Sequence, residues 1–198
     1  TLLGAAVSDG LENGQVVSGV GGQYNFVAQA FALPGARSIL ALEAARHAGA
    51  KTQSNIRWSY GHETIPRHLR DVFVTEYGVA DVRGRSDAEV IAAMLAITDS
   101  RFQDDLSRVA KDAGKLPRGF EISPAYRDNT PERIKAALKP ARDAGLLPSF
   151  PFGSDFTDVE QRLIPALVIL QDAQHAPLHL AQLVGRGWTR TPSAADNE

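Results

Sequence analysis

A glycine-rich segment near the start of the chain has the composition of a loop that binds a ligand through its backbone. It reads Ser-Gly-Val-Gly-Gly-Gln-Tyr-Asn-Phe over residues 18–26. Gly19, Gly21 and Gly22 have no Cβ atom, so the backbone can take positive φ and a ligand can approach the main-chain N–H groups. A helical pattern follows directly, and the N-terminus of a helix suits a phosphate or a developing oxyanion. The alternative is a tight strand-to-helix turn without a ligand.

A carboxylate marks a second candidate site. Residues 71–77, Asp-Val-Phe-Val-Thr-Glu-Tyr, predict a buried strand that ends just before Gly78 and carries Glu76 at its carboxyl end. Ligands of open α/β sheets bind at that end of the strands. Glu76 could therefore orient a substrate, assist proton transfer or act as a nucleophile. A structural salt bridge to Arg83 or Arg85 is the alternative.

The elements around these candidates alternate between short strands and helices in the first half of the chain. We expect a helix over 24–33, ended by Pro34-Gly35, because its apolar residues have helical spacing. This alternation predicts a mostly parallel open sheet covered on both faces. The expected strands are 15–20, 38–42, 55–58 and 71–77.

The second half of the chain predicts helices. Ser86-Asp87-Ala88-Glu89 is a capping box. The helices are expected over 87–97, 104–113 with a stop at Gly114, 131–144 with a stop at Gly145, and 158–173. Their expected inner stripes are Val90, Ile91, Met94, Leu95 and Ile97; Leu106, Val109 and Ala110; and Val159, Leu163, Leu167 and Leu170. Residues 117–130 are predicted to be a loop, and 146–154 an ordered linker.

The overall composition excludes several classes of function. The chain has 198 residues, 43% of them hydrophobic, and a net charge of −2, which argues against DNA or RNA as partners. It has no cysteine, which excludes disulfides and thiolate sites and fits a reducing, cytoplasmic location. No apolar run is long enough to cross a bilayer. Because the chain starts at Thr1 within an apolar run, we expect it to be a piece of a longer protein.

The histidines do not indicate a metal site. His175 and His179 have helical spacing, but Pro177 lies between them and no third ligand accompanies them. His62 and His68 flank Glu63 in a polar loop, where we expect both side chains to be solvated.

The segments 18–26, 38–42 and 74–86, taken in this order, closely resemble the C-terminal domain of the acetyl-CoA hydrolase/transferase family. That family belongs to the class I CoA-transferases, which include the 4-hydroxybutyrate and succinyl-CoA:acetate enzymes. The resemblance extends from Gly14 to about Phe102. It implies an α/β fold with the mostly parallel open sheet of the CoA-transferase type and a helical C-terminal extension. The implied division is a CoA-transferase domain over 1–114, a helical extension packed on it over 115–188, and a disordered tail over 189–198.

The resemblance also implies a mechanism in which a glutamate attacks an acyl-CoA thioester and a glutamyl-CoA thioester forms. Carried over by position, Gly22 supplies the oxyanion-hole amide. Coenzyme A is implied to contact Ser18, Gly19, Gly21, Gly22, Arg46 and His47. Arg46-His47 stands where relatives carry a CoA-contacting lysine. Asn25 replaces an aspartate that is common in relatives before the phenylalanine of the loop, which removes a charge there.

The nucleophilic glutamate is expected upstream of Thr1. Within the chain, Glu12-Asn13-Gly14 resembles the Glu-Asn-Gly of the two-subunit class I CoA-transferases, so Glu12 is an alternative nucleophile. The same tripeptide also fits an ordinary turn before the glycine loop. Glu76 is expected to position the substrate carboxylate.

The implied partners are an acyl-CoA, a small carboxylate, the N-terminal CoA-transferase domain of the same protein and a second copy in a homodimer. No metal and no membrane are expected. The resemblance thus implies a CoA-transferase or acyl-CoA hydrolase, and the sequence leaves transfer and hydrolysis open. The alternative from another class is a non-catalytic CoA-binding or regulatory module with the same fold. A dinucleotide-binding domain of Rossmann type is disfavoured, because the third glycine of its fingerprint and its ribose-binding acid are missing.

Overall fold

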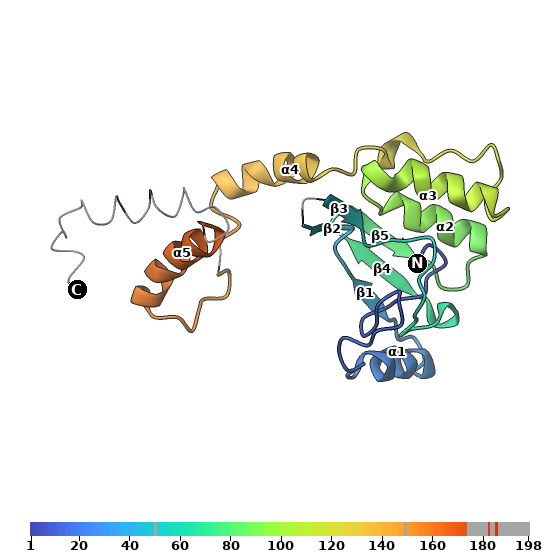
Figure 1. Ribbon diagram of the computed structural model, residues 1–198, viewed down its shortest axis with the longest axis horizontal. Helices are drawn as coiled ribbons and strands as arrows, with labels where there is room; N and C mark the ends of the chain where they lie inside the picture. Colours follow the sequence, from blue (N-terminus) through green and yellow to red (C-terminus); the bar gives the residue numbers. More distant parts are fainter. Residues whose placement is uncertain (50, 149, 174–181, 183–184, 186–198) are drawn as a thin grey trace. The chain divides into compact units, whose positions relative to one another are not determined.

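The computed structural model describes residues 1–49, 51–148, 150–173, 182 and 185. The chain divides into two compact units, Thr1–Asp143 and Ala144–Glu198 (Figure 1).

The first unit contains a three-stranded sheet in the order β1-β4-β5, built from β1 (Ile39–Ala41), β4 (Val72–Thr75) and β5 (Gly78–Asp81). Strand β1 runs parallel to β4, whereas β4 and β5 are antiparallel. A separate antiparallel hairpin is formed by β2 (Ala45–Ala48) and β3 (Lys51–Ser54). The mostly parallel sheet is therefore not confirmed in the described part of the chain. The physical reason is the two-residue connection between β4 and β5, which can join only antiparallel strands.

Two of the four expected strands did not form. Residues 15–20 make only an isolated bridge between Val16 and Gly10, and Val16 and Val17 are mostly exposed. Residues 55–58 are irregular, because the extended segment ends at Ser54 with β3. The expected strand at 38–42 is present as β1, but it lies at the edge of the sheet and Ile39 is 64% exposed.

The helices of the first unit follow the sequence pattern closely. They are α1 (Gln23–Ala32), α2 (Asp87–Ala96), α3 (Ser100–Asp112) and α4 (Pro131–Asp143), with short 3₁₀ turns η1 (Arg67–Leu69) and η2 (Pro124–Tyr126). The capping box of α2 is confirmed, because Ser86 and Glu89 exchange side-chain and backbone hydrogen bonds. Helix α3 begins four residues earlier than expected because Asp99 caps it, accepting a hydrogen bond from the amide of Arg101 at 3.0 Å.

The core of the first unit lies between α2 and the sheet. Every residue of the expected α2 stripe is buried. These side chains form one cluster with Phe73 of β4, Ala80 of β5 and Val82. Helix α1 lies apart from α2 and α3 (Figure 1) and fully buries only Val27. Helix α1 and the loop that leads into it therefore lie largely at the surface of the first unit.

The second unit contains α5 (Asp158–Ala173), with the bounds that the sequence predicts. Thr157 and Glu160 cap its first turn reciprocally. The expected inner stripe is wrong for the described residues, because Val159, Leu163 and Leu167 are each more than half exposed and Leu170 is 45% exposed. No other described element of this unit covers that face. His175, His179 and the expected tail over 189–198 lie outside the described residues. No helix within the described part of the chain is long and apolar enough to span a membrane.

Candidate active site

The glycine loop leads directly into the first turn of α1. Gly22 is the N-cap residue of that helix, and Gly21 has a φ of +61°, in the left-handed region that favours glycine. No side chain caps the helix, and its first turn contains no acidic residue. Among the described residues, no side-chain acceptor binds the N–H groups of the first turn, so these groups can donate to a ligand.

The loop is anchored at both ends by residues 8 and 9. The backbone carbonyl of Asp9 accepts hydrogen bonds from the amides of Val17 at 2.8 Å and Ser18 at 3.3 Å. The hydroxyl of Ser8 donates to Oε1 of Gln23, the first residue of α1, at 2.5 Å. The hydroxyl of Ser18 donates a long hydrogen bond within the loop, to the carbonyl of Gly19 at 3.3 Å.

A cavity of about 420 Å³ lies beside the start of this loop. It lies between the segment before the loop, the carboxyl end of β1 and strand β2. Arg46 lines it from β2, where its guanidinium donates to Asn55 at 2.9 Å. Arg57 lines it too and pairs with the carboxylate of Glu12 at 3.1 Å. Its other lining residues are Thr1, Val7, Ser8, Gly10, Leu11, Val17, Leu42, Asn55 and Tyr60.

The predicted site residues are distributed unevenly around this cavity. Arg46 is the one predicted site residue among its lining residues, and Val17, which directly precedes the glycine loop, lines it as well. The ring of His47 lies instead 3.4 Å from the hydroxyl of Thr52. The predicted loop contacts Ser18, Gly19, Gly21 and Gly22 are not among the lining residues. Glu12 is exposed in the turn before the loop, held by Arg57.

Glu76 lies in the turn between β4 and β5, with its side chain exposed. Its carboxylate accepts a hydrogen bond from the backbone amide of Ala44 at 2.9 Å. The salt bridge considered for it is not present among the described residues. Arg83 pairs instead with Asp71 at 2.6 Å, and no ion pair joins Glu76 to Arg85 there. The reason is that Asp71 is buried beside Arg83, whereas Glu76 is exposed. A buried carboxylate without a partner is strongly destabilising, so the guanidinium of Arg83 pairs with Asp71.

The sequence did not predict a cluster of three residues at the base of the loop. Asp9 is 6% exposed and accepts hydrogen bonds from Thr64 and from Nε2 of His62, the latter at 3.1 Å. The expectation that His62 is merely solvated is therefore wrong. The hydrogen bond from Thr64 lowers the pKa of Asp9, and burial, which alone would raise it, is outweighed. No local sequence signal reveals this cluster, because Asp9 and His62 are 53 residues apart.

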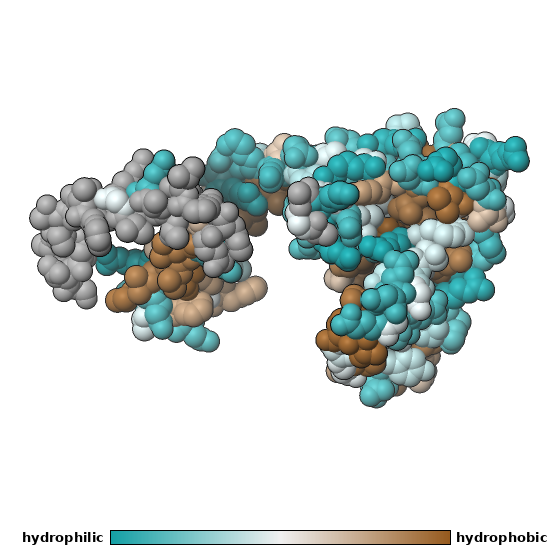
Figure 2. Space-filling model, in the orientation of Figure 1, coloured by the Kyte–Doolittle hydropathy of each residue, from teal (hydrophilic) through white to brown (hydrophobic). Residues whose placement is uncertain are grey.

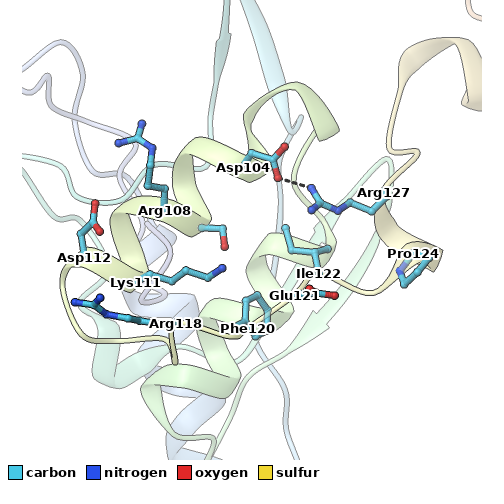
Figure 3. Close-up of a pocket in the computed structure, with 11 residues that line it drawn as sticks. Asp104, Arg108, Lys111, Asp112, Arg118, Phe120, Glu121, Ile122, Pro124 and Arg127 are labelled. Carbon is cyan, nitrogen blue, oxygen red and sulfur yellow. Dashed lines mark hydrogen bonds and ion pairs between the residues drawn. The ribbon is translucent and has the colours of Figure 1, made fainter.

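A larger cavity lies elsewhere, between α3 and residues 118–127, with a volume of about 920 Å³ (Figure 3). Its charged residues have both signs, and Asp104 and Arg127 pair across it. None of the predicted site residues lines this cavity. Within the described residues no cluster of histidine and acidic side chains suits a metal ion.

Exposed apolar side chains gather near the glycine loop. Figure 2 shows an apolar surface on the part of the first unit that holds α1 and the loop. Val17, Val20 and Phe26 are among the exposed side chains there, and Phe26 is 74% exposed. These features define the class of the protein as an α/β domain that presents a glycine loop and an uncapped helix N-terminus at its surface.

Comparison with known proteins gives the family. A family model described as the acetyl-CoA hydrolase/transferase C-terminal domain matches residues 1–110. The chain therefore belongs to the acetyl-CoA hydrolase/transferase family, as the resemblance of its motifs predicted.

Individual proteins are also similar to parts of this chain. The chain is 31% identical over 98 residues to a probable butyrate:acetyl-CoA coenzyme A-transferase of Syntrophomonas wolfei, a match that covers 48% of this chain and 22% of the relative. Among solved structures, a point mutant of RipA is 31% identical with a TM-score of 0.50, covering 58% of this chain and 26% of that one. RipA from Yersinia pestis is 30% identical with a TM-score of 0.48, covering 58% and 26%. The chain thus spans about a quarter of the length of these relatives.

Proposed function

We propose that this chain is the C-terminal domain of a CoA-transferase or acyl-CoA hydrolase that works through a glutamyl-CoA thioester. In this proposal the glycine loop binds coenzyme A and stabilises the oxyanions of the reaction. The observation that carries the proposal is the uncapped N-terminus of α1, which follows the glycine loop in a member of this family.

The loop has the physical properties that acyl transfer requires. Each step passes through a tetrahedral oxyanion, and fixed N–H donors stabilise such an oxyanion by about 3 kcal/mol each. Gly22 and the first residues of α1 present such donors without a competing side-chain acceptor. Gly19 and Gly21 have open space where a Cβ would stand, so a ligand can approach their backbone.

The neighbouring cavity supplies the positive charge that a CoA phosphate requires. Arg46 lines it and donates to the neutral Asn55, and no carboxylate of the described residues forms an ion pair with it. Arg57 shares the cavity, but Glu12 balances its charge. In this proposal Arg46 is the principal phosphate contact, and His47 lies next to it in sequence.

The chemistry proceeds by exchange of acyl partners at a glutamate. The glutamate carboxylate attacks the acyl-CoA carbonyl and displaces the CoA thiolate, which gives an acyl–glutamyl anhydride. The thiolate attacks the glutamyl carbonyl, displaces the acyl carboxylate and leaves the glutamyl-CoA thioester. An acceptor carboxylate then reverses these two steps, or water hydrolyses the thioester and releases CoA. Gly22 faces the oxyanion in each step, and Glu76 positions the carboxylate substrate.

The nucleophile is proposed to come from an N-terminal domain of the same protein. Glu12 is a poor candidate, because its carboxylate is engaged by Arg57. A guanidinium partner stabilises the carboxylate and so weakens it as a nucleophile.

The test is to trap the thioester in the full-length protein. The protein is incubated with acetyl-CoA, then treated with borohydride, and the modified residue is located by mass spectrometry. We expect a modified glutamate outside this chain, and an Arg46→Ala variant that requires more acetyl-CoA for the same labelling. Lys51→Ala, which changes a cation of the same hairpin that does not line the cavity, serves as the control. Labelling of Glu12 would overturn the placement of the nucleophile.

The second candidate is a module that binds CoA without catalysis. It is favoured if the full-length protein binds CoA, releases none from a panel of acyl-CoAs and yields no adduct. Absence of both CoA binding and adduct would exclude both functions. For the isolated chain we expect weak CoA binding in calorimetry and little or no turnover.

A further inference from the structure

A buried carboxylate lies at the base of the glycine loop. One oxygen of Asp9 accepts hydrogen bonds from the hydroxyl of Thr64 and from Nε2 of His62. The aspartate is almost fully buried, while 31% of the His62 side chain is exposed. A buried carboxylate is stable only when hydrogen bonds replace its lost solvation. The two partners from residues 62–64 therefore fix the position of residue 9.

The backbone around this carboxylate controls both ends of the loop. The carbonyl of Asp9 accepts the amides of Val17 and Ser18, where the loop begins. The amide of Ser8 donates to the hydroxyl of Thr64 at 3.0 Å, and the hydroxyl of Ser8 reaches Gln23, where the loop ends. A shift of residues 8 and 9 would thus displace the loop at its entry and at its exit.

Gly10 provides the space that this arrangement needs. A Cβ atom on Gly10 would lie 2.6 Å from Cδ2 of the His62 ring and 2.8 Å from its Cγ, closer than real Cβ contacts. Gly10 also forms the isolated bridge with Val16, one residue before the loop's first anchor. The imidazole therefore packs directly on the strand-like segment that leads into the loop.

We propose that His62 and Asp9 are positioning residues that hold the glycine loop in its ligand-binding geometry. This inference rests on the proposed function of the loop. Neither residue touches the ligand. His62 donates to the carboxylate of Asp9 and so fixes the position of residue 9. The backbone carbonyl of Asp9 then holds the amides of Val17 and Ser18. In this way the backbone from Ser18 to the first turn of α1 is held in place. Since misplacing an oxyanion donor by a fraction of an ångström weakens transition-state binding, their loss should lower kcat more than it raises KM.

The first test compares His62→Ala, His62→Gln and Asp9→Asn in the full-length protein. We expect His62→Ala and Asp9→Asn to lower kcat for acetyl-CoA about tenfold or more, with KM changed less than about threefold. Glutamine keeps an N–H donor that can reach Asp9, so His62→Gln should recover most of the activity. His68→Ala is the matched control, because His68 is an exposed histidine that lies on η1, outside this cluster. Equal losses in the alanine and glutamine variants would overturn the proposal.

The second test displaces the imidazole of His62 without substituting that residue. Gly10→Ala should reproduce the kinetic effect of His62→Ala, because the new methyl group forces the imidazole away from Asp9. Gly119→Ala is its control, since a Cβ there has no neighbour within 4 Å and the φ of Gly119 is outside the left-handed region. Wild-type kinetics for Gly10→Ala would contradict the proposed packing of His62.

The third measurement separates this inference from the proposed function. Hydrogen exchange followed by mass spectrometry reports on the amides of residues 17–23 whether or not the protein is catalytically active. We expect faster exchange there in His62→Ala than in wild type or His68→Ala, with exchange in α2 unchanged. If the wild type lacks activity but the loop amides respond, only the proposed function fails. If the loop amides do not respond, the positioning role is wrong.

Discussion

The carboxylate of Glu76 accepts a hydrogen bond from the backbone amide of Ala44, with 2.9 Å between Oε2 and the amide nitrogen. This bond ties the turn between β4 and β5 to the segment that connects β1 with β2. Ala44 is fully buried, so its amide has no access to solvent as a substitute partner. Glu76 therefore has a structural role in this domain that is independent of any contact with a substrate.

Substitution of Glu76 can separate these two roles. Glu76→Ala removes the acceptor and should lower the free energy of unfolding by about 1–2 kcal/mol. Glu76→Gln keeps an oxygen that can accept the amide, so its stability should remain within about 0.5 kcal/mol of wild type. If the charge of Glu76 also positions the substrate, Glu76→Gln should still lower kcat/KM for transfer. Urea denaturation and steady-state kinetics of both variants check this, and wild-type stability of Glu76→Ala would contradict the structural role.

The sequence predicted the elements with strong local signals. The capping box at Ser86 and the apolar spacing that follows defined α2 and its buried face, and Pro131 and Gly145 marked the limits of α4. Local patterns describe one segment at a time, however. They could not show that β5 returns antiparallel beside β4, or that the β-prone run at 15–20 finds no partner strand among the described residues.

The candidate site was predictable to the extent that its residues are close in sequence. The turn from the glycines into α1 was predicted because the glycines precede a helical pattern, and its binding of a ligand stays a prediction. The cluster of Asp9, His62 and Thr64 was not, because its members come together only through the path of the chain between them. The buried face of α5 was predicted wrongly for a related reason. Helical spacing identifies an apolar face of a helix but not the element that would cover it.

The buried carboxylate of Asp71 should make stability depend on acid. Burial alone would raise its pKa, but the guanidinium of Arg37, the amide of Ser38 and the guanidinium of Arg83 together hold the pKa below its usual range. A carboxyl group whose pKa is lowered by folding stabilises the protein above its unfolded-state pKa, and this stability is lost as the pH falls through the folded-state pKa. The free energy of unfolding should thus decrease as the pH drops below about 4.

Asp71→Asn tests this assignment. The variant leaves two guanidinium groups beside a neutral side chain, so it should be destabilised by about 3 kcal/mol at neutral pH and should lose less stability on acidification. Asp105→Asn is the control, because Asp105 is an exposed partner of Arg108 and should contribute little. Thermal unfolding of the three proteins between about pH 3 and pH 7 measures both effects. Parallel pH curves for wild type and Asp71→Asn would contradict the role of Asp71.

Two glycines of the loop should respond differently to alanine. Gly21 has a φ of +61°, so Gly21→Ala should lower the free energy of unfolding by about 1 kcal/mol. The φ of Gly19 is outside the left-handed region and a Cβ there has no neighbour within 4 Å, so Gly19→Ala should leave stability within about 0.5 kcal/mol of wild type. Urea denaturation of both variants measures the difference, and equal stabilities would contradict the assigned backbone conformations.

Gly19→Ala is then the sharper test of ligand binding. Its methyl group occupies the space through which a ligand would reach the loop backbone, so calorimetry should show weaker CoA binding at unchanged stability. Unchanged CoA affinity would show that the ligand does not approach the loop at Gly19.

The division of the chain at residues 143 and 144 predicts that the first unit folds without the second. Every residue of the buried hydrophobic cluster lies between Leu2 and Ile122, so removal of residues 144–198 takes nothing from that core. A protein truncated after Asp143 should therefore unfold cooperatively, with a Tm within a few degrees of the longer chain. Brief proteolysis of the longer chain should cut first between Ala144 and Thr157, where the described residues are mostly exposed and lie outside helices. Mass spectrometry locates the cut and calorimetry measures the Tm. Loss of the cooperative transition on truncation would show that the first unit requires residues beyond Asp143 for its stability.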